Sequence, residues 1–131
     1  MMSPRQFAAY GLRNDLKTIT QNALSFNGNE YVDLGKDNLK PTDELTLEFW
    51  IQDDWSNNET IIGNTEGSGY AICFHNNQLQ FIIYTNENGG KVLSYDHDPN
   101  QLSSGWHHIG ATFDGQYMRL YIDGEQNSLN H

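Results

Sequence analysis

One stretch of the chain decides the fold: Trp106-His107-His108-Ile109-Gly110-Ala111-Thr112-Phe113-Asp114-Gly115, followed four residues later by Leu120-Tyr121-Ile122-Asp123-Gly124. Apolar residues recur at every second position in both segments, which is typical of strands with two distinct faces. Each segment ends in Asp-Gly, a pair that tolerates the positive φ of tight turns. We therefore predict a hairpin in which Leu120 and Ile122 share an inner face with Ile109, Ala111 and Phe113.

The same alternation occurs along most of the chain. It is clearest in residues 45–52 and 79–84, and shorter runs cover residues 23–26, 31–34, 60–62, 70–74 and 91–95. Turn-forming pairs such as Asn27-Gly28, Asn76-Asn77 and Gly89-Gly90 separate these runs. Many short strands with such turns predict an all-β fold, an antiparallel two-sheet sandwich of the jelly-roll kind, rather than a parallel α/β sheet.

The first residues differ from the rest. Ser3-Pro4-Arg5-Gln6 has the form of a capping box with proline at the first helical position, and Ala8, Leu12, Leu16 and Ile19 follow at helical spacing. Three basic residues and one carboxylate give this segment a charge of +2. Because the whole chain carries −10, the remainder carries −12. We expect a short N-terminal helical arm over residues 1–21 and a sandwich over residues 22–131.

Composition excludes several classes of protein. The 131 residues carry 7 Lys+Arg against 17 Asp+Glu, a balance that argues against binding nucleic acid, and no apolar stretch is long enough for membrane insertion. The single cysteine, Cys73, excludes an internal disulfide. Residues 1–17 lack the unbroken apolar run of a secretory signal, so we expect a protein made in the cytoplasm and incorporated into a virion, or an extracellular one if the sequence is a processed fragment.

Four segments in order go beyond a generic sandwich: residues 23–34, 45–51, 106–115 and 120–124. Together they resemble the laminin G-like modules of the concanavalin A-like lectin and glucanase superfamily over about residues 23–125. The resemblance implies a jelly-roll sandwich that binds glycan or protein ligands, and many relatives hold a calcium ion in loops at the rim. In the family, further strands follow the Tyr-Ile-Asp-Gly-like turn and close the sandwich. Here they are missing before His131, so the sequence is either a fragment or a module whose exposed edges need a second copy or a partner chain, which predicts a homo-oligomer or a larger assembly.

Catalysis is not expected. Glucanases of this superfamily use two closely spaced glutamates on one strand, and glycoside hydrolysis needs such a pair. Glu48 is the nearest counterpart, and no second carboxylate follows it on the same face at the required spacing. We assign no catalytic residue.

Aromatic residues near strand ends are the candidates for ligand binding. Trp55, Tyr84 and Tyr95 lie amid Asp, Asn and Gln, and ring faces beside amides and carboxylates suit sugar rings. Trp55 is the first choice, because its neighbours Asp53-Asp54 and Ser56-Asn57-Asn58 make it hard to bury by pattern.

Two clusters have the oxygen ligands that calcium prefers. Asn27, Asn29 and Glu30 follow the first predicted sandwich strand, and Asp96 and Asp98 flank His97. Turn propensity alone also explains both clusters.

The sequence therefore predicts a non-catalytic module that recognises glycan or protein ligands within a surface or particle-associated adhesion assembly. The alternative is a structural subunit of a larger assembly, such as a virion or tail component, with the sandwich as an interaction or decoration domain. The missing secretory signal, the charge-distinct arm and the missing closing strands favour the alternative.

Overall fold

The computed structural model describes residues 5–8, 22–37, 39–65, 69–85 and 89–130. Within these residues the chain forms ten strands and no helix. No helix there is long and apolar enough to cross a membrane. The strands are β1 (Arg5–Ala8), β2 (Ala23–Phe26), β3 (Leu45–Gln52), β4 (Glu59–Asn64), β5 (Gly69–His75), β6 (Gln78–Thr85), β7 (Gly89–Asp96), β8 (Trp106–Phe113), β9 (Met118–Ile122) and β10 (Glu125–Asn130).

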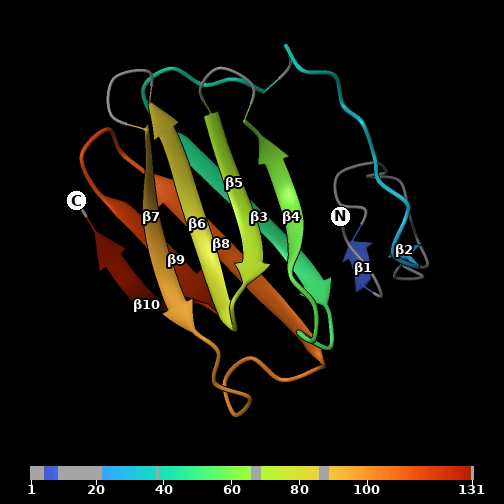
Figure 1. The fold of residues 1–131 in the computed structure, drawn as a ribbon. Helices are drawn as coiled ribbons and strands as arrows, with labels where there is room; N and C mark the ends of the chain where they lie inside the picture. The colour runs from blue at the N-terminus through green and yellow to red at the C-terminus, as the bar shows by residue number, and fades with distance from the viewer. Residues whose placement is uncertain (1–4, 9–21, 38, 66–68, 86–88, 131) are drawn as a thin grey trace, which may run out of the picture.

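Two antiparallel sheets pack face to face, as the fold prediction required (Figure 1). The six-stranded sheet has the order β10-β9-β8-β3-β1-β2, and the four-stranded sheet has the order β4-β5-β6-β7. Period-two alternation sends one set of side chains from each sheet into a shared core. The most deeply buried members of this core are Ile51, Ile72, Leu79, Phe81, Leu102, Ile109, Ala111, Leu120 and Ile122.

The hairpin that the sequence predicted joins β8 to β9. Ile109 pairs with Ile122 and Ala111 pairs with Leu120, and all four side chains are buried; Phe113 pairs with Met118 and is half-buried. The pairing confirms the predicted inner face.

Two further turns have backbone conformations that explain their residues. Asn76 and Asn77 both have positive φ (51° and 61°) between β5 and β6, and Asp123 and Gly124 do so (51° and 82°) between β9 and β10. Two-residue hairpin loops of type I′ have positive φ at both positions, and Asn, Asp and Gly tolerate it best.

The predicted N-terminal helix is not supported. Of its residues the structure describes 5–8, and these form β1, which pairs with β2 and, at Gln6 and Phe7, with β3. Strand pairing on both sides satisfies backbone groups more fully than a local capping pattern does. Residues 9–21 of the predicted helix lie outside the described residues.

Two other strand predictions differ from the structure. Residues 31–34 are not a strand, and Tyr31, Val32 and Leu34 expose 72%, 52% and 59% of their surface. β10 was not predicted, because residues 125–130 lack apolar alternation. It pairs with β9 across a register shift between Gln126 and Ser128.

Candidate functional site

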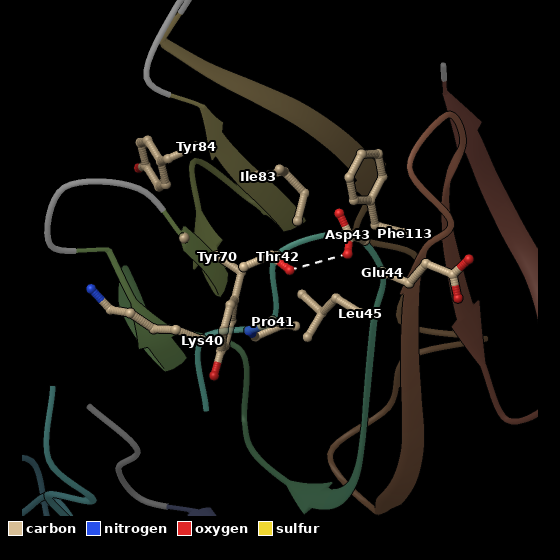
Figure 2. A pocket seen from close by; sticks show the side chains of 11 residues that line it. Lys40, Pro41, Thr42, Asp43, Glu44, Leu45, Tyr70, Ile83, Tyr84 and Phe113 are labelled. Carbon is tan, nitrogen blue, oxygen red and sulfur yellow. Dashed lines mark hydrogen bonds between the residues drawn. The ribbon is translucent and has the colours of Figure 1, made fainter. Parts of the chain in front are cut away.

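A pocket of about 410 Å³ opens at one rim of the sandwich, where β3 and β5 begin and β6 and β8 end (Figure 2). This volume lies within the range of small-molecule sites. Its walls are Lys40, Pro41, Thr42, Asp43, Glu44, Leu45, Gly69, Tyr70, Ile83, Tyr84 and Phe113. Segments from both sheets thus meet at one concave site.

The loop that leads into β3 forms one wall, and we call residues 36–37 and 39–44 the rim strap. Tyr70 from β5 donates its phenolic O–H to the carbonyl oxygen of Leu39 at 2.9 Å. Asn64 from β4 donates its Nδ2 to the carbonyl oxygen of Lys36 at 3.2 Å. Burial raises the pKa of the Tyr70 hydroxyl, so it stays a donor at neutral pH. Both bonds tie the rim strap to the four-stranded sheet.

Gly69 is the first residue of β5, and its lack of a side chain lets it come close to the end of β4 beside the pocket. A Cβ added there would overlap the carbonyl oxygen of Asn64, so no other residue fits without moving backbone. The glycine therefore fixes the separation of β4 and β5 at the pocket wall.

The pocket has an apolar side and a polar side. Leu45, Ile83 and Phe113 point toward one another across it, whereas Lys40 and Glu44 extend outward on opposite sides (Figure 2). On the polar side the Thr42 hydroxyl donates to Oδ2 of Asp43 at 3.1 Å. Such a site offers contact to an apolar ligand face together with hydroxyl and carboxylate groups for hydrogen bonds.

Tyr84 and Tyr95, two of the predicted ligand contacts, lie at opposite ends of the β6–β7 ladder. Tyr84 pairs with Gly90, lines the pocket and exposes 37% of its surface. Its ring lies over Gly90, where an added Cβ would be 3.2 Å from two ring carbons. Tyr95 pairs with Leu79, is half-buried, and donates its hydroxyl to Oε1 of Gln101 at 2.9 Å. The two rings therefore cannot contact one ligand at the pocket.

The expectation that Trp55 is hard to bury is wrong. Only 4% of its surface is exposed, and its Nε1–H donates to the carbonyl oxygen of Ser103 at 2.9 Å. Its ring packs against Phe74 and His97, with centroid distances of 5.5 and 6.4 Å. A ring enclosed to this degree has no free face for a sugar, so its place in the structure is that of a core residue.

The predicted metal ligands remain in two separate loops. Glu30 accepts from the backbone N–H of Asn27 at 2.6 Å, which lowers the pKa of its carboxyl. Asp98 accepts from the backbone N–H of Asn100 at 2.9 Å, and Asp96 accepts from Nε2 of Gln78 at 2.7 Å. Asn29 is exposed in the turn that Glu30 closes.

Glu30 and Asp98 bind their own turns, and Asp96 binds a side chain of the neighbouring strand β6. Across the described residues, no three side chains among His, Cys, Asp and Glu gather closely enough to hold a metal ion. Calcium binding stays a prediction from the sequence.

A hydrogen-bonded cluster that sequence reasoning missed joins the loop before β8 to the turn after β9. His107 exposes 7% of its surface, and its Nδ1 lies 2.6 Å from Oδ2 of Asp123. Its Nε2 lies 3.1 Å from Oγ and 3.0 Å from the carbonyl oxygen of Ser103. Oδ1 of Asp123 accepts from the backbone N–H of His108 at 2.9 Å.

A serine, a histidine and a carboxylate also make up the catalytic triad of serine hydrolases. Here, however, the Ser103 carbonyl faces the same ring nitrogen as the hydroxyl and already accepts from Trp55. The cluster therefore holds loop, strand and turn together, and we assign it a structural role.

Comparisons with known proteins agree with this fold. A family model for laminin G-like domains, described as the concanavalin A-like lectin/glucanases superfamily, matches residues 26–131. Mouse pappalysin-1 is 27% identical over 121 residues, which cover 79% of this chain and 8% of that protein. The solved structure of domains LG4-5 of the mouse laminin alpha1 chain is similar with a TM-score of 0.57 and 16% identity, over 68% of this chain and 24% of that one. The chain thus spans a small part of the length of the proteins it matches.

Proposed function

Because the chain belongs to the laminin G-like family of the concanavalin A-like lectin/glucanase superfamily, we propose that it is a non-catalytic module whose ligand occupies the rim pocket. Laminin G-like domains are typically ligand-binding modules. The observation that carries the proposal is the pocket itself, in which an apolar wall faces a loop that supplies a hydroxyl and a carboxylate, those of Thr42 and Asp43. The ligand class we favour is a glycan, because a sugar ring has one apolar face and a rim of hydroxyls.

Binding at this site would be a matter of positioning, with no bond made or broken. Ile83, Phe113 and the Tyr84 ring would take the apolar face of a sugar, while Thr42 and Asp43 would exchange hydrogen bonds with its hydroxyls. The bond from Tyr70 to the rim strap holds that loop before the ligand arrives, which reduces the ordering cost of binding. Tyr70→Phe should therefore weaken binding while leaving the fold intact.

A glycan array followed by calorimetry tests the proposal. Tyr84→Ala should weaken binding of the best glycan by roughly tenfold, the equivalent of about 1.4 kcal/mol, since one ring contact is lost. Thr42→Ala should cost several-fold. Tyr31→Ala is the matched control, because Tyr31 is 72% exposed and lies outside the pocket. Equal binding by Tyr84→Ala and the wild type would contradict the site, and binding of a protein segment in place of any glycan would correct the ligand class.

Open sheet edges support the second candidate, a structural subunit of a larger assembly. Among the described strands, β2 and β10 end one sheet and β4 and β7 end the other. Unpaired edges favour association with further strands unless something covers them. Sedimentation at low micromolar concentration separates the candidates: a stable monomer counts against the subunit, and a defined oligomer supports it. In either case we propose a surface or particle-associated adhesion assembly as the setting.

A further inference from the structure

The outer face of the six-stranded sheet carries a group of aromatic residues, two of them exposed and two half-buried. Because side chains alternate along a strand, the residues that face away from the core on β3, β8 and β9 form one surface. Trp50 and Trp106 expose 37% and 41% of their surface there, whereas their chain neighbours Ile51 and His107 are buried. The outward positions are Thr46, Glu48, Trp50, Gln52, Trp106, His108, Gly110, Thr112, Arg119 and Tyr121.

Strand pairing brings four of these side chains together, and we call Trp50, Trp106, His108 and Tyr121 the aromatic patch. Trp50 pairs with His108 across β3 and β8, and their rings meet edge to face with centroids 5.3 Å apart. Trp106 is two residues before His108 and so lies beside it on the same face. The patch occupies the half of β3 that is remote from the rim pocket, which lies at Leu45.

Gly110 shapes the middle of the patch. It pairs with Glu48 on one side and Tyr121 on the other, so no side chain stands opposite either residue. A Cβ added there would be 3.6 Å from Cβ of Tyr121 and 4.0 Å from Cε1 of His108. The carboxylate of Glu48 is therefore exposed beside the rings, across a position that lacks a side chain.

Glu48 is the one carboxylate among these outward positions, and it lies two residues from Trp50 on the same face of β3. Arg119 supplies the one Lys or Arg side chain among the outward positions of β3, β8 and β9, and it is already engaged. Its Nη1 lies 2.7 Å from Oδ2 of Asp114, and its guanidinium lies 5.3 Å from the centre of the Tyr117 ring. The chain as a whole carries −10, which adds a long-range attraction for cations.

We propose that the aromatic patch docks a basic segment of a partner protein, with one arginine side chain over Trp50 and its guanidinium bonded to Glu48, and a second basic side chain over Trp106. Exposed indole faces attract guanidinium and ammonium groups, and a carboxylate beside them accepts the planar fork of arginine. The net charge of −10 on the chain repels an anionic partner, and a second copy of the chain would bring another −10. This inference does not rest on the rim pocket, because no residue of the aromatic patch lines it.

Tryptophan fluorescence provides the assay. The chain has three tryptophans, of which Trp50 and Trp106 lie in the aromatic patch and Trp55 is buried. A peptide in which arginine alternates with glycine should quench the emission at low salt. Its lysine counterpart should bind more weakly, and its glutamate counterpart should not bind. Higher salt should weaken the arginine complex, since part of the attraction is between exposed charges.

Variants locate the binding. Trp50→Ala and Trp106→Ala should each weaken binding of the arginine peptide by roughly three- to tenfold. Calorimetry measures this binding, because each variant has lost one of the fluorescent side chains. The nearly isosteric Glu48→Gln should weaken it several-fold and reduce its salt dependence. Glu125→Gln removes the same charge from an exposed site on β10 and should change little, as should Tyr31→Ala.

Three results would overturn the proposal. These are equal binding by the Trp50→Ala/Trp106→Ala double variant and the wild type, equal losses from Glu48→Gln and Glu125→Gln, and quenching by a neutral oligosaccharide but not by the arginine peptide. Far-UV circular dichroism checks that each variant folds. Glycan binding that depends on Tyr84 is measured separately, so failure of the aromatic patch and failure of the rim pocket are distinguishable.

Discussion

Replacing Trp55 with alanine should unfold the domain more easily without acting on a ligand. The side chain is 4% exposed, packs on Phe74 and His97, and bonds the Ser103 carbonyl. Truncating a buried tryptophan to alanine typically costs about 3–5 kcal/mol. Since the whole domain is expected to have about 5–15 kcal/mol of stability, this is a large share of it.

Trp55→Phe separates the hydrogen bond from the packing. Phenylalanine keeps most of the apolar contact but cannot donate, so the Ser103 carbonyl loses a partner at a cost of about 1–3 kcal/mol. The backbone adds a second signature, because Trp55 has φ of 56°, a region that costs residues with a Cβ about 1–2 kcal/mol. Trp55→Gly should therefore be no less stable than Trp55→Ala, the reverse of the usual order.

Urea unfolding followed by far-UV circular dichroism measures these differences. Tyr31→Ala is the control, since a side chain 72% exposed should change the free energy of unfolding by within about 0.5 kcal/mol. A loss below about 1 kcal/mol for Trp55→Ala, together with abolished ligand binding, would refute the core role and restore Trp55 as a ligand contact.

Three further predictions concern Asp123, Asp114 and calcium. Asp123→Ala removes the bonds to His107 and to the His108 N–H and places alanine at φ 51°, so the urea midpoint should fall by the equivalent of about 2–4 kcal/mol. Asp123→Asn, which tolerates this φ, should lose less; equal losses would contradict the backbone argument. The pKa of Asp114 is held at about 2, below its ordinary 3.8, first by the N–H of Tyr117 and then by Arg119. A depressed carboxyl stabilises the fold above its ordinary pKa, and this contribution disappears as pH falls from about 4 toward 2. Midpoints measured across that window should therefore fall less steeply in Asp114→Asn than in the wild type; parallel curves would be inconsistent with the linkage. Calcium in excess over chelator should leave the thermal midpoint unchanged, because Glu30 and Asp98 close their own turns. A rise that Glu30→Gln or Asp98→Asn removes would establish the site that the sequence predicted.

Strands and hairpins could be predicted because their signals are local. The alternation of Phe49 and Ile51 with Glu48 and Trp50 identifies β3 and both of its faces. The same alternation places Trp50 and Trp106 on the outer face, so the aromatic patch was within reach of sequence reasoning. The pairing of Trp50 with His108 that forms the patch depends on the register of β3 against β8, which the sequence pattern does not give.

Trp55 and β1 show where local signals fail. Polar neighbours on both sides of Trp55 suggested exposure, but a left-handed backbone turns the ring under the loop that contains His97 and Ser103. The capping pattern at Ser3 predicted a helix, whereas residues 5–8 pair with strands that lie far from them in sequence. Both outcomes depend on contacts that a sequence window does not contain.

The rim pocket could be predicted only in part. Tyr84 was selected from its place near a strand end, and it lines the pocket. Its other walls come from the rim strap and from β5 and β8, which only the closed sandwich brings together. Nothing in the sequence around polar residues such as Thr42 and Asp43 indicates that they line a pocket, because the pocket forms only when the two sheets pack together.

Amide hydrogen exchange with and without the glycan selected on the array tests the central claim most directly. The account predicts slower exchange on binding at residues 42–45 and 83–84, which line the pocket, and no change at Trp106–Phe113 beyond its pocket end. Protection confined to the loops at the other end of the sandwich, around Trp55 and Tyr95, would contradict the rim pocket as the ligand site.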